Sequence, residues 1–340
     1  MTSYSTTSDA DPCTYTFCKT SSDICKLRID FDTMVLSGPT TISSTAVATD
    51  SARVGHCHTD SMTISNPGGS QPPTICGYNT GQHMYVTASD QCNQINIDID
   101  TGSTSTTRQW QIKVTQYECG NMMAPEQDCL QYFTASTGRM NTSTILLQLC
   151  LCSIGTIASF NWDTSATTVA TTQYHLVNQH YDICIRRARG YCSICYDPYI
   201  TGSGTTAAAS YGLSGSGLGP AMTSSYGPTC SGITTINPTA GSNNAQGDYL
   251  EIVALQPGTG TSSIVQTPGT ATDPAAINRI CGVYWRAAQR NPAPTAITAH
   301  ATACSYAVPF RVGVHMDDKE AIGAPQCVVI DDIKNIPCQQ

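Results

Sequence analysis

The chain has 340 residues, of which 12% are charged, and its formal net charge is −8. This acidic balance argues against a nucleic-acid surface, because phosphate binding needs concentrated lysine and arginine. The 18 cysteines favour disulfide bonds and therefore a secreted, extracellular location. No apolar stretch reaches the roughly 20 residues that a membrane helix requires, so we expect no membrane span.

Apolar and polar residues alternate along several short runs, and long amphipathic helix patterns are absent from the sequence. In chain order, this alternation predicts strands at residues 25–31, 95–99, 110–117, 249–253 and 310–314. In the first run, Leu27, Ile29 and Phe31 share one face. Short strands separated by turns favour antiparallel β-sandwiches.

The length suggests two domains of roughly 150 residues each. The composition changes after the strand that ends near Cys119. We therefore expect a first domain over residues 1–120, a linker over 121–128 and a second domain over 129–340.

The second half contains three unusual segments. Residues 201–229 and 254–275 are rich in Gly, Ser and Thr, which predicts long loops. Residues 141–154 interrupt the otherwise continuous sequence of the second half, either as a genuine insertion or as a gene-model error. They contain the only N-glycosylation sequon, at Asn141, so we expect a glycoprotein.

A motif of two cysteines occurs twice in the sequence, with its parts in the same order. The first copy places Cys57 before a strand and Cys76 in a Cys-Gly step, and the second repeats this with Cys230 and Cys281. Such repetition indicates two copies of one module.

Longer runs surround these cysteines. They are Asn66-Pro-Gly-Gly, Pro73-Thr-Ile-Cys-Gly and Gly81-Gln-His-Met-Tyr-Val in the first half, and Gly155-Thr-Ile-Ala-Ser-Phe-Asn in the second. Together they resemble the CUB-domain family, and most closely the secreted tandem CUB-domain proteins of arthropods. The resemblance implies an all-β chain of two disulfide-bonded, CUB-like antiparallel β-sandwiches, jelly-roll-like and in tandem, the first N-terminally incomplete.

The resemblance also implies disulfide pairs, although sequence alone fixes no connectivity. The implied pairs are Cys57–Cys76, Cys129–Cys184, Cys230–Cys281, Cys18–Cys25 and Cys92–Cys119. Cys304 would take Cys327 or Cys338. Cys13 has no evident partner, either because the true N-terminus is truncated or because it bridges to the second domain or another chain.

Many CUB units bind calcium through one glutamate and two aspartates, and this resemblance implies a weak calcium site in the first unit. Asp60 and Asp90 match the aspartates, but the glutamate position falls near Ser37, which supplies no carboxylate. Calcium prefers six to eight oxygen ligands, so this loss weakens the site. The alternative is that both aspartates cap turns.

Three short motifs imitate catalytic or metal sites. Asp100-Thr-Gly-Ser103 lacks the second copy that an aspartic protease needs. In His56-Cys57-His58, the implied disulfide to Cys76 occupies the cysteine. Cys192-Ser-Ile-Cys195 lies in strand-like sequence, which favours structural disulfides over redox chemistry. We therefore expect no catalytic residues and no cofactor other than calcium.

Tyrosine outnumbers phenylalanine by 16 to 5, a ratio that suits binding surfaces. Tyr196, Tyr199, Tyr211 and Tyr226 flank or lie within the 201–229 loop and are candidate binding residues, unless the loop is disordered.

Three functional hypotheses follow. The first is a secreted, non-catalytic tandem CUB protein for extracellular protein–protein recognition or adhesion, with extracellular proteins as partners. The second is a structural protein that self-assembles as a homo-oligomer into an extracellular matrix, coat or fibre. The third is an accessory CUB region of a secreted serine protease.

Overall fold

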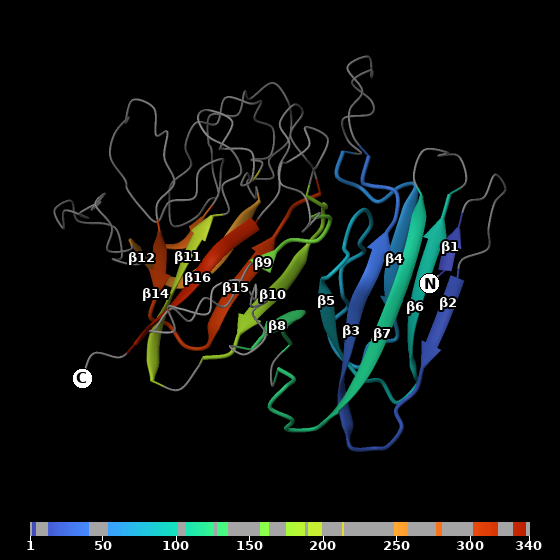
Figure 1. Cartoon of the computed structure of the whole chain (residues 1–340), viewed down its shortest axis with the longest axis horizontal. Coiled ribbons are helices and arrows are strands. Elements are labelled where there is room, and N and C mark those ends of the chain that lie inside the picture. Colours follow the sequence, from blue (N-terminus) through green and yellow to red (C-terminus); the bar gives the residue numbers. More distant parts are fainter. Residues whose placement is uncertain are drawn as a thin grey trace, which may run out of the picture. The chain divides into compact units, whose positions relative to one another are not determined.

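The computed structural model describes residues 2–4, 13–40, 54–100, 107–125, 128–134, 157–162, 175–187, 190–198, 213, 248–257, 277–280, 302–318 and 329–337. Within these ranges the chain forms strands and loops and no helix (Figure 1). The strands of the first half are β1 (Thr2–Tyr4), β2 (Cys13–Phe17), β3 (Ile24–Val35), β4 (Asp60–Ser65), β5 (His83–Thr87), β6 (Asn93–Ile99) and β7 (Arg108–Glu118). Those that follow are β8 (Gln131–Phe133), β9 (Ile157–Ala158), β10 (His180–Ile185), β11 (Tyr191–Pro198), β12 (Tyr249–Pro257), β13 (Ile277–Ile280), β14 (Ala303–Ser305), β15 (Phe310–His315) and β16 (Val329–Pro337).

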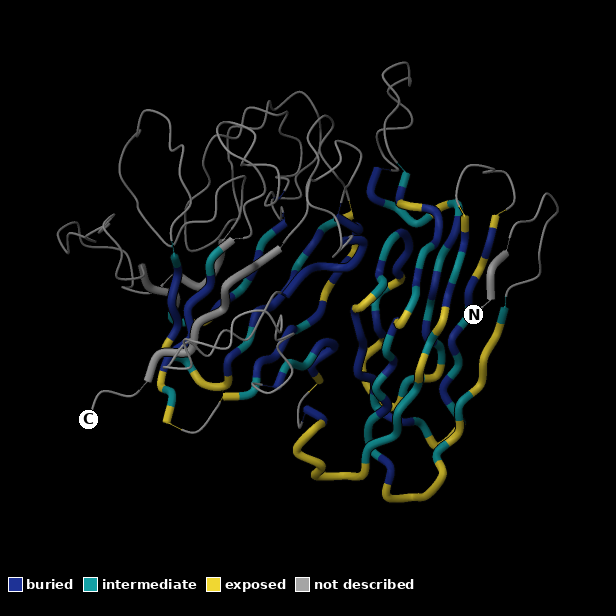
Figure 2. The backbone as a smooth tube through the Cα atoms, in the orientation of Figure 1, coloured by how far each residue is buried: buried dark blue, intermediate teal, exposed yellow. Residues whose placement is uncertain are grey.

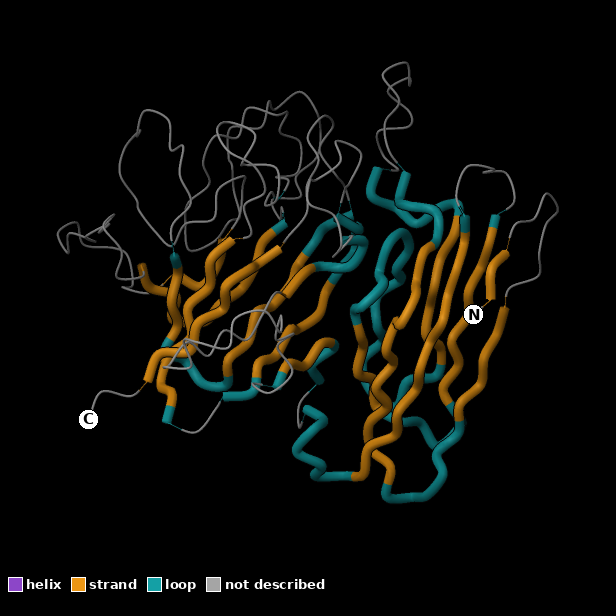
Figure 3. Tube along the Cα trace, viewed as in Figure 1, coloured by secondary structure: helices purple, strands orange, loops and turns teal. Residues whose placement is uncertain are grey.

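These strands form three sheets. Two lie in the first half, with the orders β1-β7-β3-β5 and β2-β6-β4. The third has the order β8-β10-β15-β12-β14-β11-β16-β9, with β13 beside β12. The described register pairs are antiparallel, for example β3 with β7 and β12 with β15. The all-β, disulfide-bonded β-sandwich class predicted from the sequence is therefore confirmed (Figure 3).

The chain divides into two compact units that are discontinuous in sequence. The first comprises Met1–Tyr132, Ser159–Ile183 and Met316–Pro325, and the second comprises Phe133–Ala158, Cys184–His315 and Gln326–Gln340. The linear domain boundaries at residues 120 and 128 stay a prediction.

The first unit is a sandwich because its sheets have one apolar face each. On β3, Leu27, Ile29 and Phe31 are buried, as the alternation predicted, and on β6 the residues Ile95 and Ile97 are buried. The residues between them are mostly less buried (Figure 2). A β-sheet that buries one face needs a second layer against it. Strand β5 is buried on both faces, and the Tyr85 amide on this edge strand donates a hydrogen bond to the Leu130 carbonyl at 2.7 Å.

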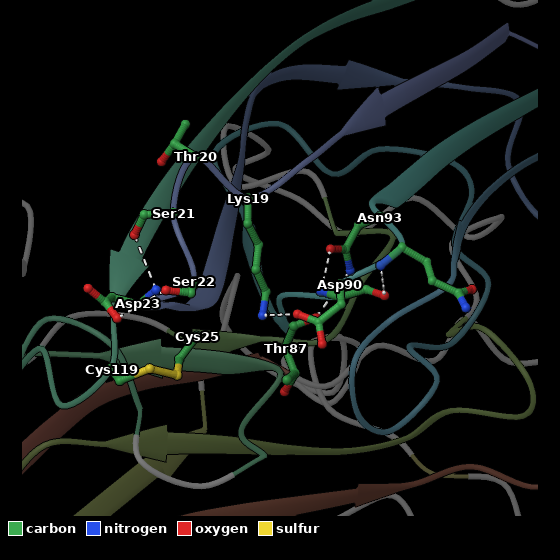
Figure 4. Close-up of polar contacts among 12 residues, drawn as sticks. Lys19, Thr20, Ser21, Ser22, Asp23, Cys25, Thr87, Asp90, Asn93 and Cys119 are labelled. Atoms are coloured by element: carbon green, nitrogen blue, oxygen red, sulfur yellow. Dashed lines mark hydrogen bonds and ion pairs between the residues drawn. A yellow bond between two sulfur atoms is a disulfide. The ribbon is translucent and has the colours of Figure 1, made fainter.

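Antiparallel register determines the disulfides of the first unit. The structure pairs Cys18 with Cys92 and Cys25 with Cys119, so the implied pairs Cys18–Cys25 and Cys92–Cys119 are wrong. Phe17 lies opposite Asn93, which places Cys18 and Cys92 next to each other at the strand ends. In the same way Ile24 lies opposite Glu118, beside the Cys25–Cys119 bond (Figure 4).

Other cysteines are bonded as well. The Cys57–Cys76 bridge forms as the resemblance implied. Cys304 bonds to Cys195, which lies directly opposite it on β11, and not to Cys327 or Cys338. Cys129, Cys184 and Cys192 are disulfide-bonded, while Cys230 and Cys281 lie outside the described residues. Cys129–Cys184 stays a prediction.

Gly77, which follows the Cys57–Cys76 bridge, has a backbone conformation that few other residues can adopt. Its φ is +75°, and a Cβ built on it would lie 1.8 Å from Asn161 Oδ1, which accepts a hydrogen bond from the Tyr78 amide. We expect Gly77→Ala to destabilise the protein by about 2–4 kcal/mol, because strain and overlap add. Urea unfolding measures this loss.

Gly120 provides a matched control. Its φ is +77°, but a Cβ there would meet nothing within 4 Å. Gly120→Ala should therefore cost only the backbone strain, about 1 kcal/mol. Equal losses for the two variants would contradict a close approach of Asn161 to Gly77.

Candidate functional site

The predicted calcium ligand Asp60 begins β4 and is only 1% exposed. Its carboxylate accepts hydrogen bonds from Arg108 Nε at 2.7 Å and from Arg108 Nη2 at 3.0 Å. It also accepts one from the Ser37 amide at 2.7 Å. Ser37 therefore lies beside Asp60, and the charge that balances the carboxylate is a guanidinium.

The buried pair is surrounded by hydrogen-bond partners. Arg108 Nη2 also donates to the Asp100 carbonyl at 2.8 Å and to Ser37 Oγ at 3.4 Å. A buried charge is tolerated only when it is paired and hydrogen-bonded. The cluster consequently acts as a structural ion pair that joins the start of β4 to the start of β7.

The second predicted ligand, Asp90, lies elsewhere. It is exposed and accepts a hydrogen bond from Lys19 Nζ at 2.8 Å, a contact that lowers the pKa of Asp90 below its ordinary value (Figure 4). Asp90 precedes Asn93 at one end of β6, whereas Asp60 lies opposite Ile99 at the other end. The six residue-to-residue steps from Asn93 to Ile99 span about 20 Å, so the two aspartates cannot share one calcium ion.

The structure therefore does not bring the two aspartates together as the predicted calcium site requires. The carboxylate of Asp60 already has a cation, and the carboxylate of Asp90 is a strand length away. Within the described ranges, no three His, Cys, Asp or Glu side chains gather closely enough to hold a metal ion. This includes His56-Cys57-His58, where Cys57 is bonded to Cys76.

Of the tyrosines predicted to bind a partner, only Tyr196 lies in the described part of the chain. Tyr196 is 0% exposed, and it lies in β11 opposite Ala303 of β14. Burial also raises its pKa. Tyr196 is thus a core residue and its predicted role at a surface is wrong. Tyr199, Tyr211, Tyr226 and the sequon at Asn141 lie outside the described residues.

Sequence reasoning missed an aromatic cluster around Tyr85. The Arg28 guanidinium lies 5.5 Å from the centre of the Tyr85 ring, and His83 and Tyr132 meet that ring edge-on. The Tyr85 hydroxyl donates to the Met123 carbonyl at 2.9 Å. The only signal in the sequence was that one strand, β5, contains both a histidine and a tyrosine and shows no clear alternation of polar and apolar residues.

His83 makes stability depend on pH. Burial, reinforced by the charge of Arg28, lowers the pKa of His83 to about 3. Between pH 6.5, the ordinary pKa of histidine, and about pH 3, the imidazole binds a proton in the unfolded chain but not in the folded one. We expect His83 to remove about 1.4 kcal/mol of stability for each pH unit of acidification between pH 6.5 and 3.

Urea unfolding of the wild type and His83→Gln between pH 7 and pH 4 tests this expectation. The variant cannot take up the proton at this position, so its stability should fall less steeply with acidification. Identical slopes for the two proteins would show that His83 is not held neutral by the fold.

Comparisons with known proteins place the chain in a family. The family model for the animal CUB domain matches residues 152–331, which is more than half of the chain. No curated protein matches the chain. Among the described residues, no helix is long and apolar enough to cross a membrane.

Two solved structures are also similar. The CUB1-EGF-CUB2 domain of human MASP-1/3 is 10% identical, and the match covers 97% of this chain and 94% of that one, with a TM-score of 0.23. The CUB1-EGF-CUB2 domains of rat MASP-1 are 10% identical over 95% and 92% of the two chains, also with a TM-score of 0.23. Scores this low support no detailed comparison. On the match to the family model, the chain belongs to the animal CUB-domain family.

Proposed function

We propose that the chain is a secreted, non-catalytic tandem CUB protein that mediates extracellular protein–protein recognition or adhesion, like the secreted tandem CUB-domain proteins of arthropods. CUB domains often serve as extracellular interaction modules, and the disulfides suggest secretion. The observation that carries the proposal is that three disulfides crosslink strand ends and loops of the first unit. Crosslinked loops lose less conformational entropy when a partner binds.

Binding to extracellular proteins tests this proposal. The chain, produced through a secretory pathway, is passed over an array of purified secreted proteins and receptor ectodomains in surface plasmon resonance. We expect saturable binding to at least one of them. The reduced and alkylated chain, which loses its crosslinks, is the matched control. Binding that survives reduction, or no binding at all, would contradict the proposal.

Self-assembly is the second candidate, favoured by Cys13. Among the described cysteines it is the free one, it is half-buried, and it lies on β2, at the edge of the β2-β6-β4 sheet. Edge strands pair readily with other chains. Analytical ultracentrifugation should then show a homo-oligomer that Cys13→Ser weakens. A monomer in which the Cys13 thiol reacts with a thiol reagent would count against assembly.

A further inference from the structure

Two methionines, Met122 and Met123, are neighbours in the turn that follows β7. Met122 is 79% exposed and Met123 is 40% exposed. Among the large apolar side chains that the structure describes, that of Met122 is the most exposed. The thioether groups of this methionine pair are therefore open to small molecules in solution.

Hydrogen bonds fix the backbone of this turn. The Met123 amide donates to Asn121 Oδ1 at 2.9 Å, and the Met123 carbonyl accepts a hydrogen bond from the Tyr85 hydroxyl at 2.9 Å. The amide of Ala124, which is buried, donates to the Asn121 carbonyl at 3.0 Å. The folded chain consequently presents the methionine pair to solvent, and no local unfolding is needed to expose it.

Four further methionines lie in the core of the described chain. Met34 on β3, Met62 on β4 and Met84 on β5 are 0% exposed, and so is Met316. A reagent in solution reaches these sulfur atoms only when the chain opens locally or globally. Global opening costs the whole free energy of unfolding. The fold therefore divides these six methionines into an accessible pair and a protected group of four.

We propose that Met122 and Met123 form a modification site that takes up oxygen from a hydroperoxide, and that this oxidation leaves the fold intact. With hydrogen peroxide, a lone pair of the thioether sulfur attacks one oxygen, and an S–O bond forms as the O–O bond breaks. Sulfur loses two electrons to the peroxide. The departing hydroxide takes the proton of the transferred oxygen and leaves as water, and the product is methionine sulfoxide.

Oxidation changes the chemistry of the surface at this turn. Sulfoxide formation converts a flexible apolar side chain into a polar one, and methionine sulfoxide reductases reverse the change. An apolar contact made through Met122 would therefore weaken on oxidation and return on reduction, while the packing of the core stays the same. This modification goes beyond the proposed recognition function and does not depend on it.

The test treats the folded whole chain with dilute hydrogen peroxide and follows each methionine by proteolysis and mass spectrometry. Of the six described methionines, we expect Met122 to gain one oxygen atom fastest and Met123 next. The four buried ones should react at least about a hundredfold more slowly, because only an opened chain exposes them. In urea the six rates should converge. Similar rates in the folded chain, or an unreactive Met122, would overturn the inference.

Two variants separate the roles of the two positions. Met122→Leu should remove the fastest of these oxidations and leave Met123 reacting at its own rate. Met84→Leu, the same change at a buried position, is the matched control and should leave the rates of Met122 and Met123 unchanged. Loss of the reaction at Met123 in Met122→Leu would contradict a site made of two separately exposed sulfur atoms.

Urea unfolding checks that the fold survives the modification. The chain oxidised only at Met122 and Met123 should unfold at the same urea concentration as the untreated chain, because both side chains already face solvent. A clearly lower midpoint would contradict this part of the proposal. Incubation with a methionine sulfoxide reductase should remove the added oxygen from both residues, and oxygen that stays in place would show that the folded site is not reversible.

Discussion

Replacing Asp60 with asparagine is expected to lower the free energy of unfolding by about 3–5 kcal/mol. The change leaves the Arg108 guanidinium, whose side chain is 3% exposed, without its counter-charge. A buried cation that loses its partner keeps the whole desolvation cost. Urea unfolding at neutral pH, followed by tryptophan fluorescence, measures the loss, because Trp110 is buried on β7, two residues after Arg108.

Two controls separate this effect from the substitution itself. Asp90→Asn makes the same chemical change at an exposed ion pair with Lys19, and should alter stability little because solvent screens that pair. The double variant Asp60→Leu, Arg108→Met removes both charges and should recover most of the loss. If Asp60→Asn and Asp90→Asn were equally mild, the buried ion pair would not stabilise this fold.

Removing the Cys18–Cys92 bridge by replacing both cysteines with alanine should cost about 4 kcal/mol. The bond closes a loop with a sequence separation of 74 residues, and the entropy that a crosslink removes from the unfolded chain grows with loop length. The same argument gives a similar loss for Cys25–Cys119, with a separation of 94, and about 3 kcal/mol for Cys57–Cys76, with a separation of 19. Unfolding midpoints under non-reducing conditions measure the order.

Peptide mapping without reduction checks the pairing directly. Peptides joined through Cys18 and Cys92, and through Cys25 and Cys119, are expected from the wild type. Peptides joined through Cys18 and Cys25 would contradict the register of β2 with β6 and of β3 with β7. Each double-alanine variant should lose only its own crosslinked peptide and keep the others.

Local patterns predicted the strands well. The alternation in residues 25–31 and 95–99 lies within β3 and β6, and the residues predicted to share a face, Leu27, Ile29 and Phe31, are buried together. Residues 110–117 lie within β7, and 310–314 within β15. These predictions succeed because a strand shows each face every second residue, so burial of one face is visible in a short run.

The candidate site was less predictable. The resemblance put the missing calcium-binding glutamate near Ser37, and in the structure the Ser37 amide donates a hydrogen bond to the Asp60 carboxylate. Nothing in the sequence, however, indicated that Arg108 would supply the balancing charge from β7, 48 residues further on. Likewise, Gln179, just before β10, donates a hydrogen bond to the Thr74 carbonyl, 105 residues earlier in the chain.

The all-β class, the faces of the main strands and the disulfide-rich character of this CUB protein follow from the amino-acid sequence alone, because composition and period-two patterns are local properties. The pairing of the cysteines, the burial of Tyr196, and the positions of Asp60 beside a guanidinium and of Asp90 at the far end of β6 follow from the three-dimensional structure. Those outcomes depend on strand register and sheet packing, which bring together residues that are distant in the chain.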